Sequence, residues 1–101
     1  MSEAQIEKQI QAAGLTAPRL TPILIDEVIV DEKYHVFEGT CLTVCCLVLR
    51  NGFTVVGESA CASPENFNAE IGRNIARDNA RQKIWQLEGY LLRSKLQEAT
   101  K

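Results

Sequence analysis

An Asn-Gly dipeptide between two apolar runs is the feature that most constrains how this chain can fold. Residues 40–49 and 53–61 are rich in β-forming side chains, and Asn51-Gly52 lies at the centre of the segment that joins them. In a two-residue loop, Asn-Gly readily adopts the positive φ angles of a type I′ turn. The sequence therefore predicts an antiparallel β-hairpin of about 40–49 and 53–61.

The predicted turn also fixes a register, with Val48 opposite Val55 and Cys46 opposite Gly57. One face of the hairpin would then carry Leu42, Val44, Cys46, Val48, Phe53 and Val55, and the other Thr43, Cys45, Leu47, Leu49, Val56 and Glu58. Both faces are substantially apolar, whereas a sheet with one solvated face alternates more cleanly. Helices of the same chain can cover one face, and we expect a neighbouring subunit to cover the other. The hairpin thus predicts a homo-oligomer, a dimer or higher.

Two short helices are predicted before the hairpin. Residues 2–13 begin with Ser2 as a helix N-cap, and residues 22–30 follow Thr21-Pro22, an N-cap with proline at the first helical position. The β-branched residues within 22–30 make a strand the close alternative there.

One long helix is predicted after the hairpin, over about 64–97, because Ser63-Pro64 repeats the N-cap and proline signature. Residues 34–37 are a candidate third strand. The prediction is a single α+β domain over residues 1–101, with short N-terminal helices, an antiparallel hairpin and a long C-terminal helix. A chain of this length has room for one modest core, so oligomerisation is a natural way to bury more surface.

Charge is unevenly distributed along the chain. Residues 1–32 carry two basic and six acidic side chains, a net charge of −4, whereas residues 64–97 carry six basic and four acidic ones, a net charge of +2. A positive C-terminal half attracts either an anionic ligand or the acidic N-terminal half. The overall charge of −2 argues against non-specific DNA coating, for which basic surfaces supply the affinity.

The sequence carries no recognisable leader, membrane-span or metal signature. Glu3 and Glu7 are acidic where a signal peptide would have its basic N-terminal region. The longest apolar stretch, 41–49, is too short to span a bilayer. The four cysteines contain no Cys-x-x-Cys pair, and His35 alone completes no common zinc pattern. We expect reduced thiols, no metal, no cofactor, and a location in the cytoplasm of a host cell.

Catalysis is not expected from these residues. The sequence has no phosphate-binding glycine loop and no nucleophile elbow, and nothing in it brings His35 to a particular cysteine. The adjacent acids Asp31 and Glu32 are typical of a solvated turn. The prediction is that the protein is not an enzyme.

An arginine ridge is the first candidate binding feature. Arg73, Arg77 and Arg81 are spaced by four and lie along one face of the predicted helix. Guanidinium groups match phosphate oxygens in bidentate fashion. The alternative is an ordinary charged face, partly neutralised by Glu70 and Asp78.

The start of the predicted long helix is the second candidate. Asn66 and Asn68 flank Phe67 where unpaired N–H groups favour anions, and an aromatic ring beside amides suits a nucleobase. The alternative is that Phe67 belongs to the core and that the asparagines cap the helix. Phe53, just after the turn, is a further candidate for stacking or for a subunit contact.

From Tyr34 onward the sequence is similar to a known family. The similarity covers residues 34–93, about sixty of the 101, and the first twenty residues lie outside it. The matching stretches are Tyr34-His35-x-Phe37, Gly39-Thr40, Leu42-Thr43-Val44-Cys45, Asn51-Gly52-Phe53-Thr54-Val55, Gly57-Glu58-Ser59-Ala60, Asn66-Phe67, Glu70-Ile71-Gly72-Arg73, Ile75-Ala76-Arg77, Asn79-Ala80, Lys83-Ile84-Trp85 and Leu87-Glu88-Gly89-Tyr90-Leu91-Leu92. They resemble a family of small phage proteins, catalogued as hypothetical products of podophages and prophages, which includes the first type of Thoeris anti-defence sponge.

The resemblance implies a function in binding. Sponges of this kind sequester cyclic ADP-ribose isomers made by bacterial TIR enzymes, and some also hold cyclic oligonucleotides. They do so without cleavage, in dimers or higher assemblies with pockets at subunit interfaces. Combined with the residues above, the hypothesis is a sponge whose ligand-binding residues are Phe53, Asn66, Phe67, Asn68, Arg73, Arg77 and Arg81. A protein–protein module that inhibits a host factor is the alternative, and a DNA-metabolism accessory is a third, disfavoured by the charge.

Overall fold

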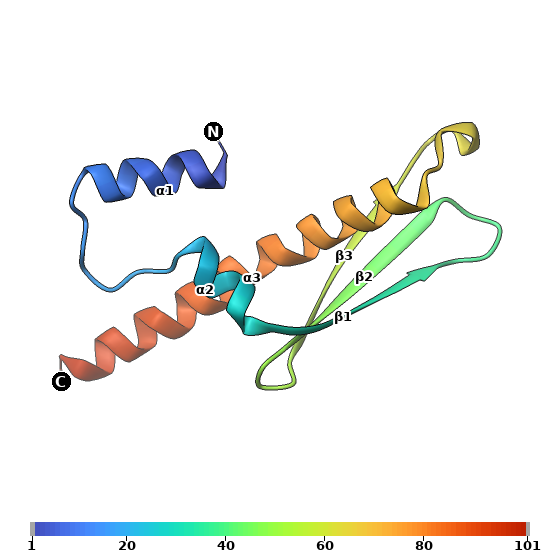
Figure 1. Cartoon of the computed structure of the whole chain (residues 1–101). Coiled ribbons are helices and arrows are strands. Elements are labelled where there is room, and N and C mark those ends of the chain that lie inside the picture. The colour runs from blue at the N-terminus through green and yellow to red at the C-terminus, as the bar shows by residue number, and fades with distance from the viewer. Residues whose placement is uncertain (1, 101) are drawn as a thin grey trace.

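Residues 2–100, which the computed structural model describes, fold into an antiparallel sheet with a long helix across one face and two short helices beside it (Figure 1). The elements in order are α1 (Glu3–Ala12), α2 (Pro22–Val28), β1 (Ile29–Val36), β2 (Leu42–Leu49), β3 (Thr54–Ala60), a 3₁₀ turn (Pro64–Asn66) and α3 (Ala69–Ala99). The strand order is β1-β2-β3. The predicted α+β class, short N-terminal helices, hairpin and long C-terminal helix are confirmed.

Side-chain caps begin both N-terminal helices as predicted. The Ser2 hydroxyl accepts from the Gln5 N–H at 3.1 Å, and the Gln5 side chain accepts from the Ser2 N–H at 2.8 Å, which forms a capping box. The Thr21 hydroxyl accepts from the Leu24 N–H at the start of α2. The predicted end of the second helix at residue 30 is wrong, because Ile29 already belongs to β1. The predicted helix is thus confirmed over residues 22–28, and the β-branched residues at its end belong to a strand, which was the close alternative.

The hairpin turn differs from the predicted type I′ turn. The Leu49 N–H donates to the Phe53 carbonyl and the Gly52 N–H donates to the Leu49 carbonyl, both at 2.8 Å. Gly52 has a φ of 89°, but no residue other than glycine between 2 and 100 has a positive φ, as a type I′ turn would require of Asn51. The loop therefore has three residues, 50–52, with glycine in the left-handed position.

The longer loop shifts the predicted register by one residue. Val55 lies opposite Leu47 instead of Val48, and Gly57 lies opposite Cys45 instead of Cys46. A shift of one residue moves every side chain of a strand to the other face of the sheet. The predicted faces of β2 are correct, but those of β3 are exchanged, so that Val55 joins the core and Val56 is exposed.

The third strand is longer than expected. The prediction placed it at 34–37, whereas β1 covers Ile29–Val36 and pairs with β2 over nearly its whole length. Phe37 lies beyond the strand and still donates its N–H to the Leu42 carbonyl at 3.3 Å. The charged residues of β1 concealed this strand, because they break the apolar alternation that marks a strand in a sequence.

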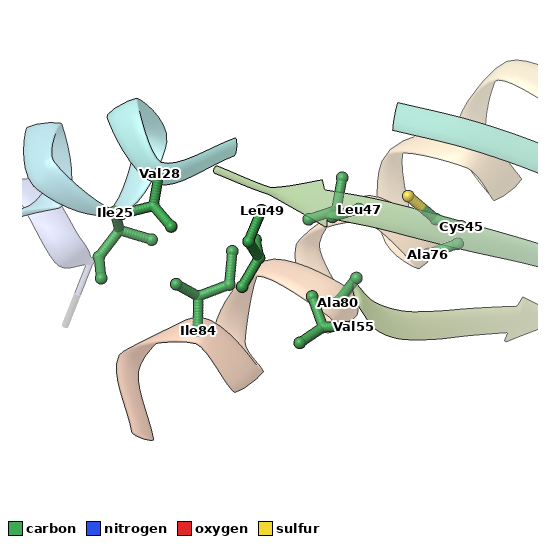
Figure 2. Packing of buried hydrophobic residues seen from close by; sticks show 9 residues of the cluster. All are labelled: Ile25, Val28, Cys45, Leu47, Leu49, Val55, Ala76, Ala80 and Ile84. Atoms are coloured by element: carbon green, nitrogen blue, oxygen red, sulfur yellow. The ribbon is translucent and has the colours of Figure 1, made fainter. Parts of the chain in front are cut away.

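The core lies between the sheet and α3 and extends to α2 (Figure 2). It consists of Ile25, Val28, Cys45, Leu47, Leu49, Val55, Ala76, Ala80 and Ile84. Burial lowers the tendency of Cys45 to ionise and raises its pKa. At Gly57 the helix backbone lies directly on β3, since an added Cβ would come within 2.2 Å of the Ala76 carbonyl oxygen and of the Ala80 nitrogen. Small residues on both sides therefore set how closely α3 can pack.

The long helix begins later than predicted. Ser63-Pro64 opens only the short 3₁₀ turn, and Ser63 makes no side-chain cap. Asn68 is the true N-cap of α3, with its side-chain oxygen 3.0 Å from the Ile71 N–H. The helix then continues through Gly89 to Ala99, beyond the predicted end at 97.

The second face of the sheet carries no element of residues 2–100. Side chains on this face come from alternate positions of β2, flanked by residues of β1 and β3; its apolar members are Leu42, Val44, Cys46, Val48 and Val56. The expectation that the chain covers only one apolar face is thus consistent with the fold. What covers the other face stays a prediction.

We predict that Gly57→Ala destabilises the fold by about 3 kcal/mol, because the new methyl group would force α3 away from β3. Gly89→Ala is the matched control. Its methyl group would meet only the Leu20 side chain at 3.8 Å, and alanine is favoured over glycine inside a helix by about 1 kcal/mol. Urea denaturation of the two variants measures both effects. Equal midpoints for Gly57→Ala and the wild type would refute the close packing.

Candidate binding site

The arginine ridge is largely engaged within the chain. Arg81 is buried on α3, where its guanidinium donates to the carboxylate of Glu3 at 2.6 and 2.9 Å and to that of Asp26 at 2.8 Å. It also donates to the Pro22 carbonyl at 3.2 Å. These bonds, chiefly that to Glu3, raise the pKa of Arg81. Arg81 therefore holds α1 and α2 against α3, and its hydrogen-bonding groups are directed to its own chain.

Arg77 makes a similar connection to the sheet. It donates to the Glu32 carboxylate on β1 at 2.8 Å, and the Tyr34 hydroxyl donates to the same carboxylate at 2.9 Å. The bond from Arg77, followed by that from Tyr34, lowers the pKa of Glu32. Burial, with the bond to Glu32, raises the pKa of Tyr34. Arg73 is exposed and forms no ion pair with the described residues, so of the ridge it alone is free to meet an anion.

These contacts explain the charge asymmetry of the chain. Two basic residues of α3, Arg77 and Arg81, meet acidic residues from the N-terminal half, in agreement with one of the two interpretations of the sequence. A further pair within the N-terminal half joins α1 to the loop that follows it, because Arg19 donates to both oxygens of Glu7 at 2.7 and 2.8 Å. The acidic residues of the N-terminal half thus neutralise arginines of the same chain.

Asn66, Phe67 and Asn68 lie together at the start of α3, as predicted. They line a hollow of about 120 Å³ with Cys41, Cys61 and Gly72 among its other walls. The Asn68 oxygen is occupied by the helix cap, and the Phe67 ring is 37% exposed. A hollow this small is below the usual 300–1,000 Å³ of a small-molecule pocket. This hollow alone can contact one side of a ligand, but it is too small to enclose a ligand.

Phe53 lies in a larger pocket at the opposite end of the sheet. This pocket, of about 430 Å³, is formed by the hairpin turn, the end of α2 and the C-terminal half of α3. Its lining residues are Val28, Leu49, Leu87 and Leu91, with Phe53 and the polar Arg50, Asn51, Glu88 and Lys95. The Phe53 ring is 57% exposed, and neither Arg50 nor Lys95 forms an ion pair with another residue between 2 and 100. The pocket combines apolar walls, an open aromatic ring and free positive charge.

Arg50 and Lys95 could not be associated from the sequence, because they are 45 residues apart and come to one pocket only in the fold. A partial signal was present. Leu87, Leu91 and Lys95 are spaced by four, so they share one face of α3, and Arg50 adjoins the turn that α3 reaches.

The predicted ligand-binding residues do not form one site within a single chain. The Phe67 hollow includes Ile71 and the Phe53 pocket includes Leu87, both on α3. At a rise of about 1.5 Å per residue, these positions are roughly 24 Å apart along the helix. The structure brings together Asn66, Phe67 and Asn68, and it separates them from Phe53, Arg77 and Arg81.

An apolar hollow of about 350 Å³ lies beneath α1, between Ile6, Ile10, Leu20 and Trp85. None of the described residues of α1 is buried, so the ion pairs of Glu3 and Glu7 are its principal attachments.

His35 is exposed and makes an edge-to-face contact with Phe37, at 4.6 Å between ring centroids. Among residues 2–100, no three metal-binding side chains of the His, Cys, Asp and Glu types gather in one place.

We predict that the Glu7 carboxyl titrates far below its ordinary range. Hydrogen bonds from Arg19 and then Gln11 lower its pKa from 4.5 to about 2. A carboxyl with a lowered folded-state pKa stabilises the fold fully above its unfolded pKa, and that contribution is lost as the pH falls from about 4.5 to about 2. Carbon NMR of the Glu7 carboxyl should find the low midpoint, and Arg19→Gln should move it up towards the ordinary value of 4.5. A midpoint that the substitution leaves unchanged would contradict the pairing.

The chain was also compared with known proteins. No curated protein and no solved structure matches it. Among residues 2–100, no helix combines the length and the apolar composition needed to cross a bilayer. A family described as phage protein (N4 Gp49/phage Sf6 gene 66) matches residues 20–96, which include the sheet, the Phe67 hollow and the Phe53 pocket. The match covers more than half of the sequence, so the chain belongs to this family of small phage proteins.

Proposed function

We propose that this phage protein binds a nucleotide-derived immune signal, a cyclic ADP-ribose isomer or a cyclic oligonucleotide, and sequesters it without cleavage. The observation that carries the proposal is the Phe53 pocket, where an exposed aromatic ring lies beside Arg50 and Lys95 over an apolar floor. Its volume of about 430 Å³ is within the range of small-molecule sites. This pocket, and not the arginine ridge, is the proposed binding site.

The aromatic, basic and amide side chains of the pocket match parts of a cyclic nucleotide. A nucleobase stacks on an aromatic face, and such stacking contributes about 1–3 kcal/mol per base. Phosphate oxygens are matched by the arginine fork and attracted by the lysine charge. The Asn51 side-chain oxygen already accepts the Phe53 N–H at 2.9 Å, which orders the turn and leaves the amide nitrogen for a polar edge of the ligand.

We further propose that two copies associate through the uncovered sheet face. The apolar residues of this face come mainly from β2, and Val56 of β3 is 42% exposed. Lys33 on β1 and Glu58 on β3 lie on either side of them. If two sheets stack about a two-fold axis parallel to the strands, β1 of one copy lies over β3 of the other. Lys33 of each copy then lies over Val56 of its neighbour, two residues along the strand from Glu58, which is within diagonal reach of a long side chain. A second copy of the chain thus matches the face in both hydrophobicity and charge.

We predict that calorimetry with cyclic ADP-ribose isomers and cyclic di- and trinucleotides detects binding by at least one of them. Phe53→Ala should weaken that binding by about 5- to 150-fold through lost stacking, and Arg50→Ala with Lys95→Ala should weaken it further and reduce its salt dependence. The matched controls are Phe67→Ala and Arg93→Ala, which change an aromatic ring and a cation outside the pocket. Mass spectrometry of the ligand after denaturation should recover it intact.

Two results would refute this proposal. The first is no heat with any of these ligands at micromolar protein, and the second is release of a cleaved product. A protein recovered stoichiometrically from host lysate, with no small molecule bound, would favour the inhibitor of a host factor instead.

We predict that Val56→Lys converts the oligomer to monomers, because it places a charge within the apolar face, beside Cys46 of the central strand. Ile23→Lys is the matched control, since Ile23 is an exposed isoleucine on α2, away from the sheet. Light scattering coupled to size exclusion gives the mass of each. A wild type that is monomeric at every concentration, or a Val56→Lys variant with unchanged mass, would contradict the interface.

A further inference from the structure

We propose that Cys41 and Cys61 are a redox-active dithiol that forms a reversible intramolecular disulfide across the open end of the β2–β3 hairpin. Leu42 lies opposite Ala60 in the last pair of the ladder, so the next residues along each strand, Cys41 and Cys61, are placed opposite each other. Both line the hollow beside Phe67, and both are partly exposed. This inference is independent of the proposed binding function.

The backbone spacing suits a disulfide. Residues directly opposite in an antiparallel pair have Cα atoms about 4.5–5.5 Å apart, and disulfides span about 4.4–6.8 Å between Cα atoms. The two thiols are close enough that Cys61 raises the pKa of Cys41. No large movement of the strands is needed to join the two sulfur atoms.

The remaining cysteines are poorly placed to compete. Cys45 is on β2, four residues after Cys41, which is roughly 14 Å at the rise of a strand, and it is fully buried. Cys46 projects from the opposite face of the sheet, in register with Lys33 and Val56. Cys61 is therefore the specific partner of Cys41.

The reaction is a thiol–disulfide exchange with a small disulfide such as glutathione disulfide. The thiolate of one cysteine attacks a sulfur of glutathione disulfide, which forms a mixed disulfide and expels one glutathione thiolate. The second cysteine then attacks the protein sulfur of the mixed disulfide and expels the other glutathione. Two thiols of the protein are oxidised, one glutathione disulfide is reduced to two glutathione molecules, and the two protons pass to these products.

The cross-link would fix the strand ends next to the connection that leads to α3. Residues 62–68 join Cys61 to the N-terminus of α3 and carry the wall of the Phe67 hollow. Because the disulfide closes the loop that contains the whole hairpin, it restricts the unfolded chain and stabilises the folded one. The oxidation state of this pair would thus set the rigidity of one end of the molecule.

The test is oxidation of the folded full-length protein in graded glutathione and glutathione disulfide, followed by acid quenching, alkylation and peptide mapping. The expected result is a Cys41–Cys61 linkage with a mass loss of about 2 Da, two thiols left for alkylation, and a melting temperature raised by about 10 °C that reductant reverses. Cys46→Ser is the matched control and should keep the linkage. Cys41→Ser and Cys61→Ser should instead retain a glutathione adduct on the remaining cysteine.

Three results would overturn the proposal. They are wild-type protein that carries only separate glutathione adducts, a linkage through Cys45 or Cys46, and cross-linked dimers in place of the intramolecular bond. A linkage that lowers the melting temperature would also count against it, because the strand ends would then be strained by the bond. The wild-type mapping decides these cases even if one of the serine variants fails to fold.

Discussion

The close approach of α3 to β3 at Gly57 is the constraint on which the rest of the structure depends. The helix contributes Ala76 and Ala80 at this contact, and an added methyl group on Gly57 would overlap their backbone. Because the helix lies so close, one face of the sheet is shielded from solvent, and the buried residues of β2 and β3 pack against α3 (Figure 2). The same contact leaves the other face of the sheet without a cover from residues 2–100, and it directs the second half of α3 beyond the sheet towards the N-terminal helices (Figure 1). The Phe53 pocket exists because this half of the helix passes the hairpin turn.

Charge pairs then attach the outer elements to this scaffold. Arg81 holds α1 and α2 through Glu3 and Asp26, and Arg77 holds β1 through Glu32. An arginine already bonded to two carboxylates gains little from a phosphate, since the ligand would have to displace bonds that are in place. The free positive charge of the Phe53 pocket is for this reason a better anchor for an anion than Arg77 or Arg81 of the ridge. In the proposed function, the ligand is bound by Arg50 and Lys95, which form no ion pair with other described residues of the chain.

Much of the fold was predictable from local signals in the sequence. Ser2 and Thr21 marked helix starts correctly because a capping side chain acts over only three residues. The Asn-Gly dipeptide located the hairpin but not its register, since Asn51 adopts a negative φ in a three-residue loop and the faces of β3 are exchanged as a result. The start of α3 was misplaced because Ser63-Pro64 and Asn68 are both good helix starts, and the short turn between them uses the first. The site was less predictable: the partners of Arg81 are 55 and 78 residues away, and Arg50 and Lys95 meet only when α3 crosses the turn.

In the proposed function, the Phe53 pocket holds a cyclic nucleotide signal. A crystal structure of the protein with a bound cyclic ADP-ribose isomer tests it most directly. We expect the adenine to lie against the Phe53 ring and the phosphates to face Arg50 and Lys95, with the ligand uncleaved. A ligand found on the arginine ridge or in the Phe67 hollow, with the Phe53 pocket empty, would contradict it.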